Sequence, residues 1–205
     1  MIERIMGKKI GMTQIFVGDR VVPVTAINLG NWFVTGLKTE ERDGYVAVQV
    51  GCLRDKYASK EFQSDWLKSL KTHFRLVKEI RMDQPDDALQ IGQALDFRNY
   101  VTQGDSVDVK GASRGRGFQG CVKRHGFGGF SASHGSTMMR RPGSVGFMRS
   151  QGRIIKGKRF PGQMGSETVV LKNLEIIQIQ QDAPVIFVKG SVPGHSGSFV
   201  IISKA

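Results

Sequence analysis

Residues 109–166 of the chain read VKGASRGRGFQGCVKRHGFGGFSASHGSTMMRRPGSVGFMRSQGRIIKGKRFPGQMGS. This basic stretch contains 12 Lys and Arg and no Asp or Glu, whereas the whole chain has 30 basic and 18 acidic residues. Outside it the charges balance at 18 against 18, so the net charge of +12 lies within these 58 residues. The basic residues are Lys110, Arg114, Arg116, Lys123, Arg124, Arg140, Arg141, Arg149, Arg153, Lys156, Lys158 and Arg159.

The basic stretch is also rich in glycine, with 14 of the 26 glycines of the chain, and no helical or strand period of apolar residues runs through it. A segment of this composition repels itself and loses much conformational entropy when it becomes ordered. We therefore expect it to form no core of its own and to become ordered only against a polyanion. Nucleic acid is the leading candidate.

The rest of the chain has the composition of a globular protein. At 205 residues with 40% apolar content, it is long enough to bury a core in one domain or two small ones. We find no leader sequence and no apolar run of membrane-spanning length, which predicts an intracellular protein without a membrane partner. Cys52 and Cys121 lack metal-ligand spacing, so we expect two reduced thiols and no metal site.

Strand patterns flank the basic stretch on both sides. On the N-terminal side they cover residues 12–17, 21–29, 33–38, 45–53, 76–82 and 106–110, with a hairpin turn at Gly18-Asp19 and a break at 84–87. On the C-terminal side they cover 168–180, 185–189 and 198–203, with a turn at 181–184. Between the predicted strands 45–53 and 76–82, Ser59 offers an N-cap, and apolar residues at helical spacing predict about three turns of amphipathic helix over 59–74.

This order predicts a mainly β protein: an antiparallel β-barrel with one short amphipathic helix and a long irregular basic extension. Residues 1–110 and 166–205 would form the barrel body, and residues 111–165 would be an RNA-binding loop inserted in it. Because strands precede and follow the insertion, its two ends are expected to leave the sheet side by side. So long a structureless loop is acceptable only if it is functional, which its charge supports.

Two glycine motifs in the basic stretch suggest nucleotide enzymes. Residues 115–120 fit GxGxxG, yet the glycine-rich residues 126–129 leave no room for the required helix, and no acidic residue occurs before Glu167. Residues 152–158 have Walker A spacing, but Arg159 stands where Ser or Thr must reach the magnesium ion. Both readings are rejected, and we expect no catalytic residues, no cofactor and no small-molecule substrate.

Aromatic rings are interleaved with the basic residues. They are Phe118, Phe127, Phe130, Phe147 and Phe160, and some of them are expected to pack on protein instead. Rings that stack on splayed bases beside cations suit irregular RNA, whereas a reader of duplex DNA would present an ordered helix. His125 and His134 have no nearby carboxylate or metal ligand, so they are either RNA contacts or plain loop residues.

The order of motifs resembles the large-subunit ribosomal protein L-three family, in its bacterial and organellar form. The resemblance covers nearly the full chain, least clearly between about 54 and 99. It rests on Gly7-Lys8-Lys9-Ile10-Gly11-Met12-Thr13, Asp43-Gly44-Tyr45, Ala47-Val48-Gln49, Ser113-Arg114-Gly115-Arg116-Gly117-Phe118, Lys123-Arg124, Ser133-His134-Gly135, Arg141-Pro142-Gly143-Ser144-Val145-Gly146, Lys156-Gly157-Lys158, Gly162, Gly165, Glu167, Asn173-Leu174, Val188-Lys189-Gly190 and Val192-Pro193-Gly194.

The resemblance implies a barrel of the translation-protein type and a structural role in the large ribosomal subunit. It also implies binding to large-subunit ribosomal RNA early in assembly, neighbouring large-subunit proteins, and a loop that reaches toward the peptidyl transferase centre, with its tip at about 146–152. Bacterial relatives often carry a methylated glutamine where this chain has Arg149, so methylation is not expected there. They usually have Thr-Pro where this chain has Ser150-Gln151.

Three functions compete on these observations. A structural ribosomal protein would reside in cytoplasmic ribosomes, or in those of an organelle, and a free-standing RNA chaperone or translation factor is the alternative. An enzyme with a phosphate cradle fails on the missing acidic and hydroxyl partners. The predicted RNA-binding residues are the 12 basic residues together with His125 and His134.

Overall fold

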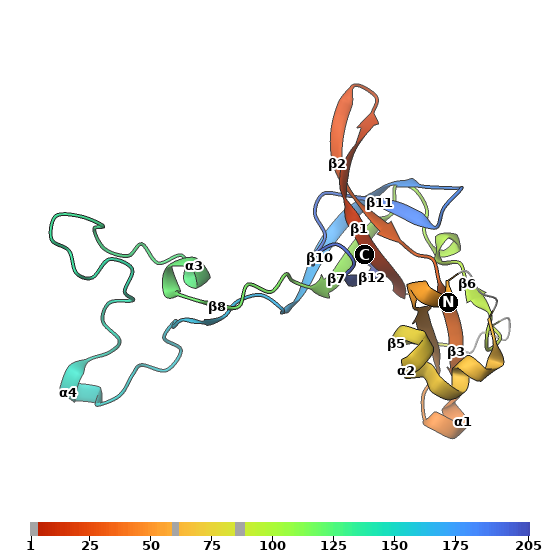
Figure 1. Cartoon of the computed structure of the whole chain (residues 1–205), viewed down its shortest axis with the longest axis horizontal. Coiled ribbons are helices and arrows are strands. Elements are labelled where there is room, and N and C mark those ends of the chain that lie inside the picture. Colours follow the sequence, from red (N-terminus) through yellow and green to blue (C-terminus); the bar gives the residue numbers. More distant parts are fainter. Residues whose placement is uncertain (1–3, 59–61, 85–88) are drawn as a thin grey trace. The chain divides into compact units, whose positions relative to one another are not determined.

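The computed structural model describes residues 4–58, 62–84 and 89–205, and strands dominate its secondary structure (Figure 1). The chain divides into two compact units. The body comprises Met1–Ala112 and Thr168–Ala205, and the basic loop comprises Ser113–Glu167. The prediction of a mainly β protein is therefore confirmed.

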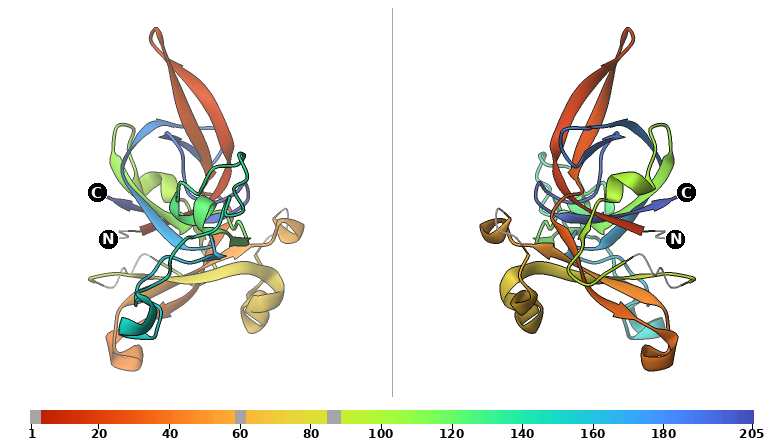
Figure 2. Two further views of the ribbon diagram at one scale, coloured as in Figure 1. Left: turned by 90° about the vertical axis from the view of Figure 1, so that its left-hand side faces the viewer. Right: turned by 90° about the vertical axis from the view of Figure 1, so that its right-hand side faces the viewer.

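Six strands of the body pair into a closed ring in the order β1-β12-β7-β10-β11-β2, with β2 pairing again to β1. All six pairings are antiparallel, as the sequence predicts. The strands are β1 (Arg4–Val17), β2 (Arg20–Asn28), β7 (Ser106–Ala112), β10 (Thr168–Ile179), β11 (Val185–Lys189) and β12 (Phe199–Lys204). Gly18, with φ of +58°, lies in the predicted turn of the β1–β2 hairpin, which Figure 2 shows standing out from the ring.

Alternation along the strands directs one face of the ring inward. In β7 the side chains of Val107 and Val109 are fully buried while their neighbours are exposed or half-buried, and Val200 and Ile202 of β12 repeat this pattern. Such a period of two is what a strand with one buried face requires. Because β7 and β10 also bound the basic loop in the chain, the loop begins and ends on paired strands of a packed core.

The remaining body strands form a second sheet, in the order β5-β4-β3-β6. The prediction that all body strands belong to one barrel is therefore wrong for these four strands. They are β3 (Trp32–Lys38), β4 (Ala47–Leu53), β5 (Phe74–Arg81) and β6 (Ala94–Leu95). The turn after β2 redirects the chain: the amide of Gly30 donates to Oδ1 of Asn28 at 2.7 Å, and Asn31 has φ of +64°. The pattern of predicted strands does not indicate that the chain leaves the ring at this turn.

The predicted three-turn helix over 59–74 is wrong in type and length. A 3₁₀ helix, η2 (Ser64–Ser69), is followed by one α-helical turn, α2 (Leu70–His73), and Phe74 already begins β5. No side chain caps either element, and the proposed cap at Ser59 lies outside the described residues. The apolar pattern instead reflects a small cluster in which Trp66 is buried against Leu53 and Phe74.

Other short elements complete the body: α1 (Glu40–Asp43), η1 (Asp55–Tyr57) and η3 (Phe97–Tyr100). Strand β1 begins at Arg4, well before the predicted start at residue 12. The other predicted strands agree with the observed ones within about two residues at either end. The predicted break at 84–87 falls mostly outside the described residues. Both cysteines are free and buried, and no described helix has the length and apolar character to cross a bilayer.

Candidate nucleic-acid interface

The basic loop begins and ends in a stem, formed by residues 113–119 on the outgoing strand and 162–167 on the returning strand. The amide of Ser113 donates to the carbonyl of Glu167 at 2.8 Å, and the amide of Arg116 to that of Met164 at 2.9 Å. Further along, β8 (Phe118–Gln119) pairs with β9 (Gly162–Gln163). Gly165 has φ of +74°, and a Cβ there would overlap the carbonyl oxygen of Arg114, so the stem requires glycine at this position.

A short helix, α3 (Cys121–His125), follows the outgoing strand, and Gly126 ends it in the left-handed region with φ of +70°. The prediction that no helix fits after the GxGxxG motif is therefore wrong. One turn fits before Gly126, although it is far shorter than a dinucleotide-binding helix. The motif still lacks the acidic partner that binds a ribose.

Two predicted RNA contacts on α3 serve the loop itself. Nη1 of Arg124 donates to the carbonyl oxygen of Phe160 at 2.8 Å, and Nε2 of His125 lies 3.0 Å from the same oxygen. Both side chains are half-buried, and Sγ of the buried Cys121 lies 3.7 Å from the carbonyl oxygen of Arg159. These contacts attach α3 to the segment just before the returning strand, so the Arg124 guanidinium already uses one of its donors within the loop.

Beyond α3 the loop is irregular. One turn closes where the amide of Phe130 donates to the carbonyl of Met139 at 2.7 Å, and the exposed His134 lies within it with φ of +56°. Farther along, α4 (Met148–Gln151) carries the exposed Arg149. Arg140 and Arg141 stand between these two parts and are exposed.

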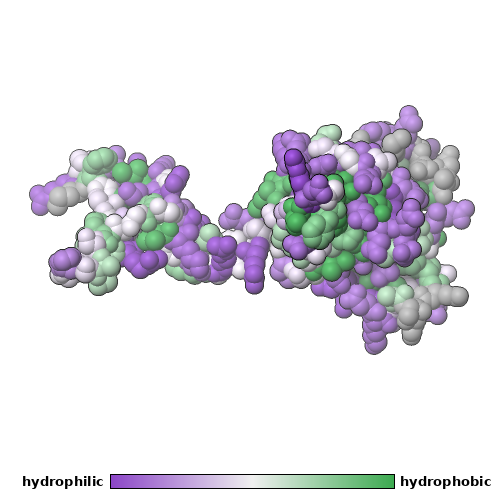
Figure 3. Space-filling view, turned by 90° about the horizontal axis from the view of Figure 1, so that it is seen from above, coloured by the Kyte–Doolittle hydropathy of each residue, from purple (hydrophilic) through white to green (hydrophobic). Residues whose placement is uncertain are grey.

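The cations of the loop have almost no internal partners. Of the 12 basic residues of the stretch, only Arg124 is half-buried, and the others are exposed. Among the described residues, every ion pair joins side chains of the body. Figure 3 shows hydrophilic side chains along much of the loop. A field of one sign without internal neutralisation attracts a polyanion and raises its association rate.

The aromatic rings of the loop divide between solvent and protein. Phe118, Phe130 and Phe147 are exposed, whereas Phe127 and Phe160 are half-buried. Exposed rings beside arginines can stack on unpaired bases. The ring of Phe127 instead lies 6.0 Å from the ring of His125.

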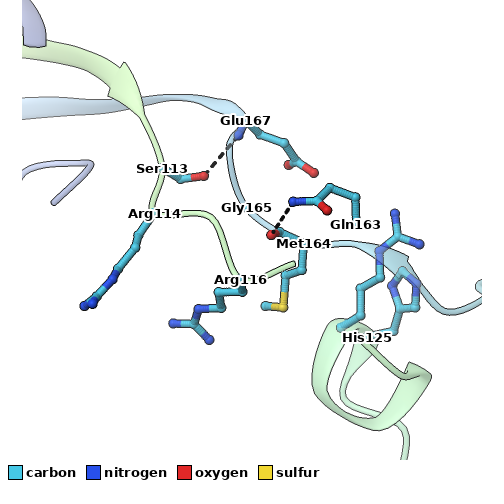
Figure 4. Close-up of a pocket in the computed structure, with 9 residues that line it drawn as sticks. Ser113, Arg114, Arg116, His125, Gln163, Met164, Gly165 and Glu167 are labelled. Atoms are coloured by element: carbon cyan, nitrogen blue, oxygen red, sulfur yellow. Dashed lines mark hydrogen bonds between the residues drawn. The ribbon is translucent and has the colours of Figure 1, made fainter. Parts of the chain in front are cut away.

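A hollow of about 490 Å³ opens at the stem, and we call it the stem hollow (Figure 4). Its lining combines three arginines and a histidine with one carboxylate, an amide and a thioether. The residues are Ser113, Arg114, Arg116, Arg124, His125, Gln163, Met164, Gly165 and Glu167. Sequence reasoning identified its cations but missed Gln163 and Glu167. The available signal was that Glu167 is the first acidic residue after the basic stretch.

Within residues 4–58, 62–84 and 89–205, no group of three or more His, Cys, Asp or Glu side chains could hold a metal ion. The exposed guanidinium and ammonium groups of the loop are donors that bind phosphate oxygens well. The arrangement is therefore suited to binding an anion along its length.

Comparison with known proteins supports a single family. The family model described as Ribosomal protein L3 matches residues 76–185. The Large ribosomal subunit protein uL3 of Thermosipho melanesiensis is 44% identical over 201 residues, which cover 98% of this chain and 97% of that relative. The proteins of the same name from Syntrophomonas wolfei and Syntrophus aciditrophicus are 43% and 40% identical, covering 98% and 100% of this chain and 95% and 94% of theirs.

These matches span the body and the basic loop alike, with nearly the full length of each relative covered. They agree with the motifs spread over the chain from Gly7 to Gly194. The chain therefore belongs to the ribosomal protein L3 family.

Proposed function

We propose that this protein is a structural constituent of the large ribosomal subunit that binds large-subunit ribosomal RNA through its basic loop. The names of the relatives support the subunit, and the loop supports the RNA. One observation carries the proposal: the exposed cations of the loop have no anionic partner among the described residues. A protein that binds no polyanion would gain nothing from so large an unbalanced positive charge.

The finer parts of the proposal are supported by the resemblance to the family. The closed ring of six strands is the barrel of the translation-protein type, seated on the subunit beside neighbouring large-subunit proteins, and the protein binds early in assembly. The part of the loop around α4 and Arg149 reaches toward the peptidyl transferase centre. The protein has no chemistry of its own and resides in cytoplasmic ribosomes, a location that its bacterial relatives favour over an organelle.

The predicted RNA-binding residues have unequal parts in this proposal. The exposed cations contact phosphate, whereas Arg124 and His125 chiefly hold α3 in place through Phe160. A free-standing RNA chaperone or translation factor finds no support among the named relatives. Sedimentation distinguishes this alternative from the proposed function, because a ribosomal protein is expected to remain with the large subunit through a high-salt wash.

The salt dependence of binding to large-subunit ribosomal RNA tests the RNA proposal, with the full chain in a filter-binding assay. If about six of the cations each neutralise a phosphate, affinity falls roughly 10³-fold between 50 and 200 mM salt. A loss of that order supports phosphate contacts. A slope near zero contradicts them and favours a protein partner for the loop.

A further inference from the structure

The stem hollow contains a group that a surface for phosphate alone would not contain. Glu167 is the only acidic residue of the basic loop, and its side chain borders the same hollow as Arg114 and Arg116. A carboxylate repels phosphate and only accepts hydrogen bonds from donors. Its presence among guanidinium groups indicates a ligand that carries both a negative group and hydrogen-bond donors.

The backbone that carries this carboxylate is held on both sides. The amide of Glu167 donates to Oγ of Ser113 at 3.2 Å, and its carbonyl oxygen accepts from the amide of Ser113 at 2.8 Å. The amide of Met164 donates to the carbonyl of Gly117 at 3.0 Å. The hollow therefore has a floor fixed by main-chain hydrogen bonds, as a binding site requires.

Charges of both signs remain available to a ligand. Among the described residues, no ion pair involves Glu167, Arg114 or Arg116. Figure 4 shows Arg114 and Arg116 reaching in one direction, while Glu167 and Gln163 lie on the other side of the segment at Gly165. A ligand that spans the hollow can thus present its anion to one side and its donors to the other.

The dimensions and the chemistry of the hollow select the class of ligand. Its volume of about 490 Å³ lies in the range of small-molecule sites and exceeds the needs of a single phosphate. The thioether of Met164 borders the same space and can contact the flat face of an aromatic ring. Phosphate, ring and donors occur together in a nucleotide.

We propose that the stem hollow binds one unpaired RNA nucleotide, with its phosphate on Arg114 and Arg116 and a guanine edge on the carboxylate of Glu167. The Watson–Crick edge of guanine presents two adjacent donors, N1–H and N2–H, to the two oxygens of a carboxylate. Adenine places an acceptor beside its donor, and inosine lacks the amino group. This inference rests on the proposed RNA binding and adds the identity of one bound base.

The test uses the full chain and the RNA pentamers UUGUU, UUIUU and UUAUU, with binding measured by fluorescence anisotropy at constant salt. The guanine pentamer is expected to bind about tenfold more tightly than the adenine pentamer, with inosine between them. Glu167→Gln reduces this preference to about twofold or less without weakening the adenine pentamer, because it removes a repulsive charge. Arg114→Ala combined with Arg116→Ala weakens all three pentamers.

Glu175→Gln is the matched control, because it removes one carboxylate from an exposed ion pair with Lys189 in the body. It is expected to leave the guanine preference unchanged. Equal binding of the three pentamers, absence of binding, or a preference that survives in Glu167→Gln overturns the inference. If ribosomal RNA binding stays strongly salt-dependent while the pentamers are not discriminated, the nucleotide site fails and the proposed function stands.

Discussion

The body and the basic loop differ most in how they treat positive charge. In the body, Arg98 donates from Nη2 to Oδ2 of Asp96 at 2.7 Å, and this hydrogen-bonded pairing lowers the pKa of the carboxyl group below its usual value. Even the buried Lys9, whose pKa is lowered by desolvation, donates from Nζ to the carbonyl oxygens of Val192 at 2.7 Å and Gly194 at 3.1 Å.

Among the described residues of the loop, no cation has a carboxylate partner, and Arg124, with the carbonyl oxygen of Phe160, is the exception that has a backbone acceptor. The apolar residues of the loop form no core. Both apolar clusters of buried residues belong to the body. The comparison shows two units of different kinds in one chain. The body is ordered by its own buried core, whereas we expect the basic loop to become ordered only when it binds a partner. The four predictions below test this division, from the largest expected effect to the smallest.

Deletion of residues 115–162, with a short linker joining the ends, is expected to have the largest effect. Affinity for ribosomal RNA falls about 10³-fold or more at low salt, because most of the phosphate contacts are lost. The free energy of unfolding changes little, since the strands on both sides supply the core and a shorter loop costs less closure entropy. RNA filter binding and urea denaturation measure the two. Loss of cooperative unfolding would show that the loop is part of the core.

A matched pair of core and loop substitutions compares the interiors directly. Ile202→Ala in β12, where the side chain is 0% exposed, is expected to destabilise the body by about 2–5 kcal/mol. Ile154→Ala in the loop, where the side chain is 52% exposed, is expected to change stability by less than about 0.5 kcal/mol. Urea midpoints with equal slopes check both, and similar costs at the two sites would contradict the division.

Charge removal in the loop is expected to have a moderate effect on RNA binding alone. Arg140→Ala combined with Arg141→Ala lowers affinity roughly tenfold and reduces the salt slope by about two, whereas Arg149→Ala reduces it by about one. Lys68→Ala is the control, because Lys68 is paired with Asp65 at 2.7 Å in the body. If this control weakened RNA binding as much as the double substitution, phosphate contacts would have to extend over the body.

The smallest effect concerns acid stability. The Asp105 carboxylate accepts from the amide of Thr102 at 2.9 Å and pairs with Lys204 at 3.1 Å, which lowers its pKa from 3.8 to about 2. Its contribution to the folded body is present above about pH 4 and is lost as the pH falls through about 2. Asp105→Asn should therefore unfold in urea with a weaker pH dependence between pH 5 and 2. An unchanged dependence would show that other carboxylates dominate.

Much of the fold could be predicted from local sequence. The alternation in β7 and β12 and the glycine turn between β1 and β2 report local geometry, and the strands flanking the loop agree with prediction. The separate second sheet could not be predicted, because it depends on the turn at Asn31 and on long-range pairing. The helix at 59–74 failed because aromatic packing around Trp66 imitates helical spacing.

The candidate site divides in the same way. Composition alone located the cations, since a net charge concentrated in one stretch needs no tertiary information. The internal hydrogen bonds of Arg124 and His125 could not be predicted, because their acceptor Phe160 lies 36 and 35 positions further along the chain. The stem hollow likewise exists only where residues 113–116 and 163–167 lie side by side.

Amide hydrogen exchange of the full chain, measured free and bound to large-subunit ribosomal RNA, tests the central claim most directly. In the free protein we expect strong protection in the ring strands and little in the loop beyond its stem and α3, since most loop amides have no internal acceptor among the described hydrogen bonds. Addition of RNA should protect the loop and leave the ring strands unchanged. A loop already protected without RNA, or one that gains no protection with it, would contradict the account.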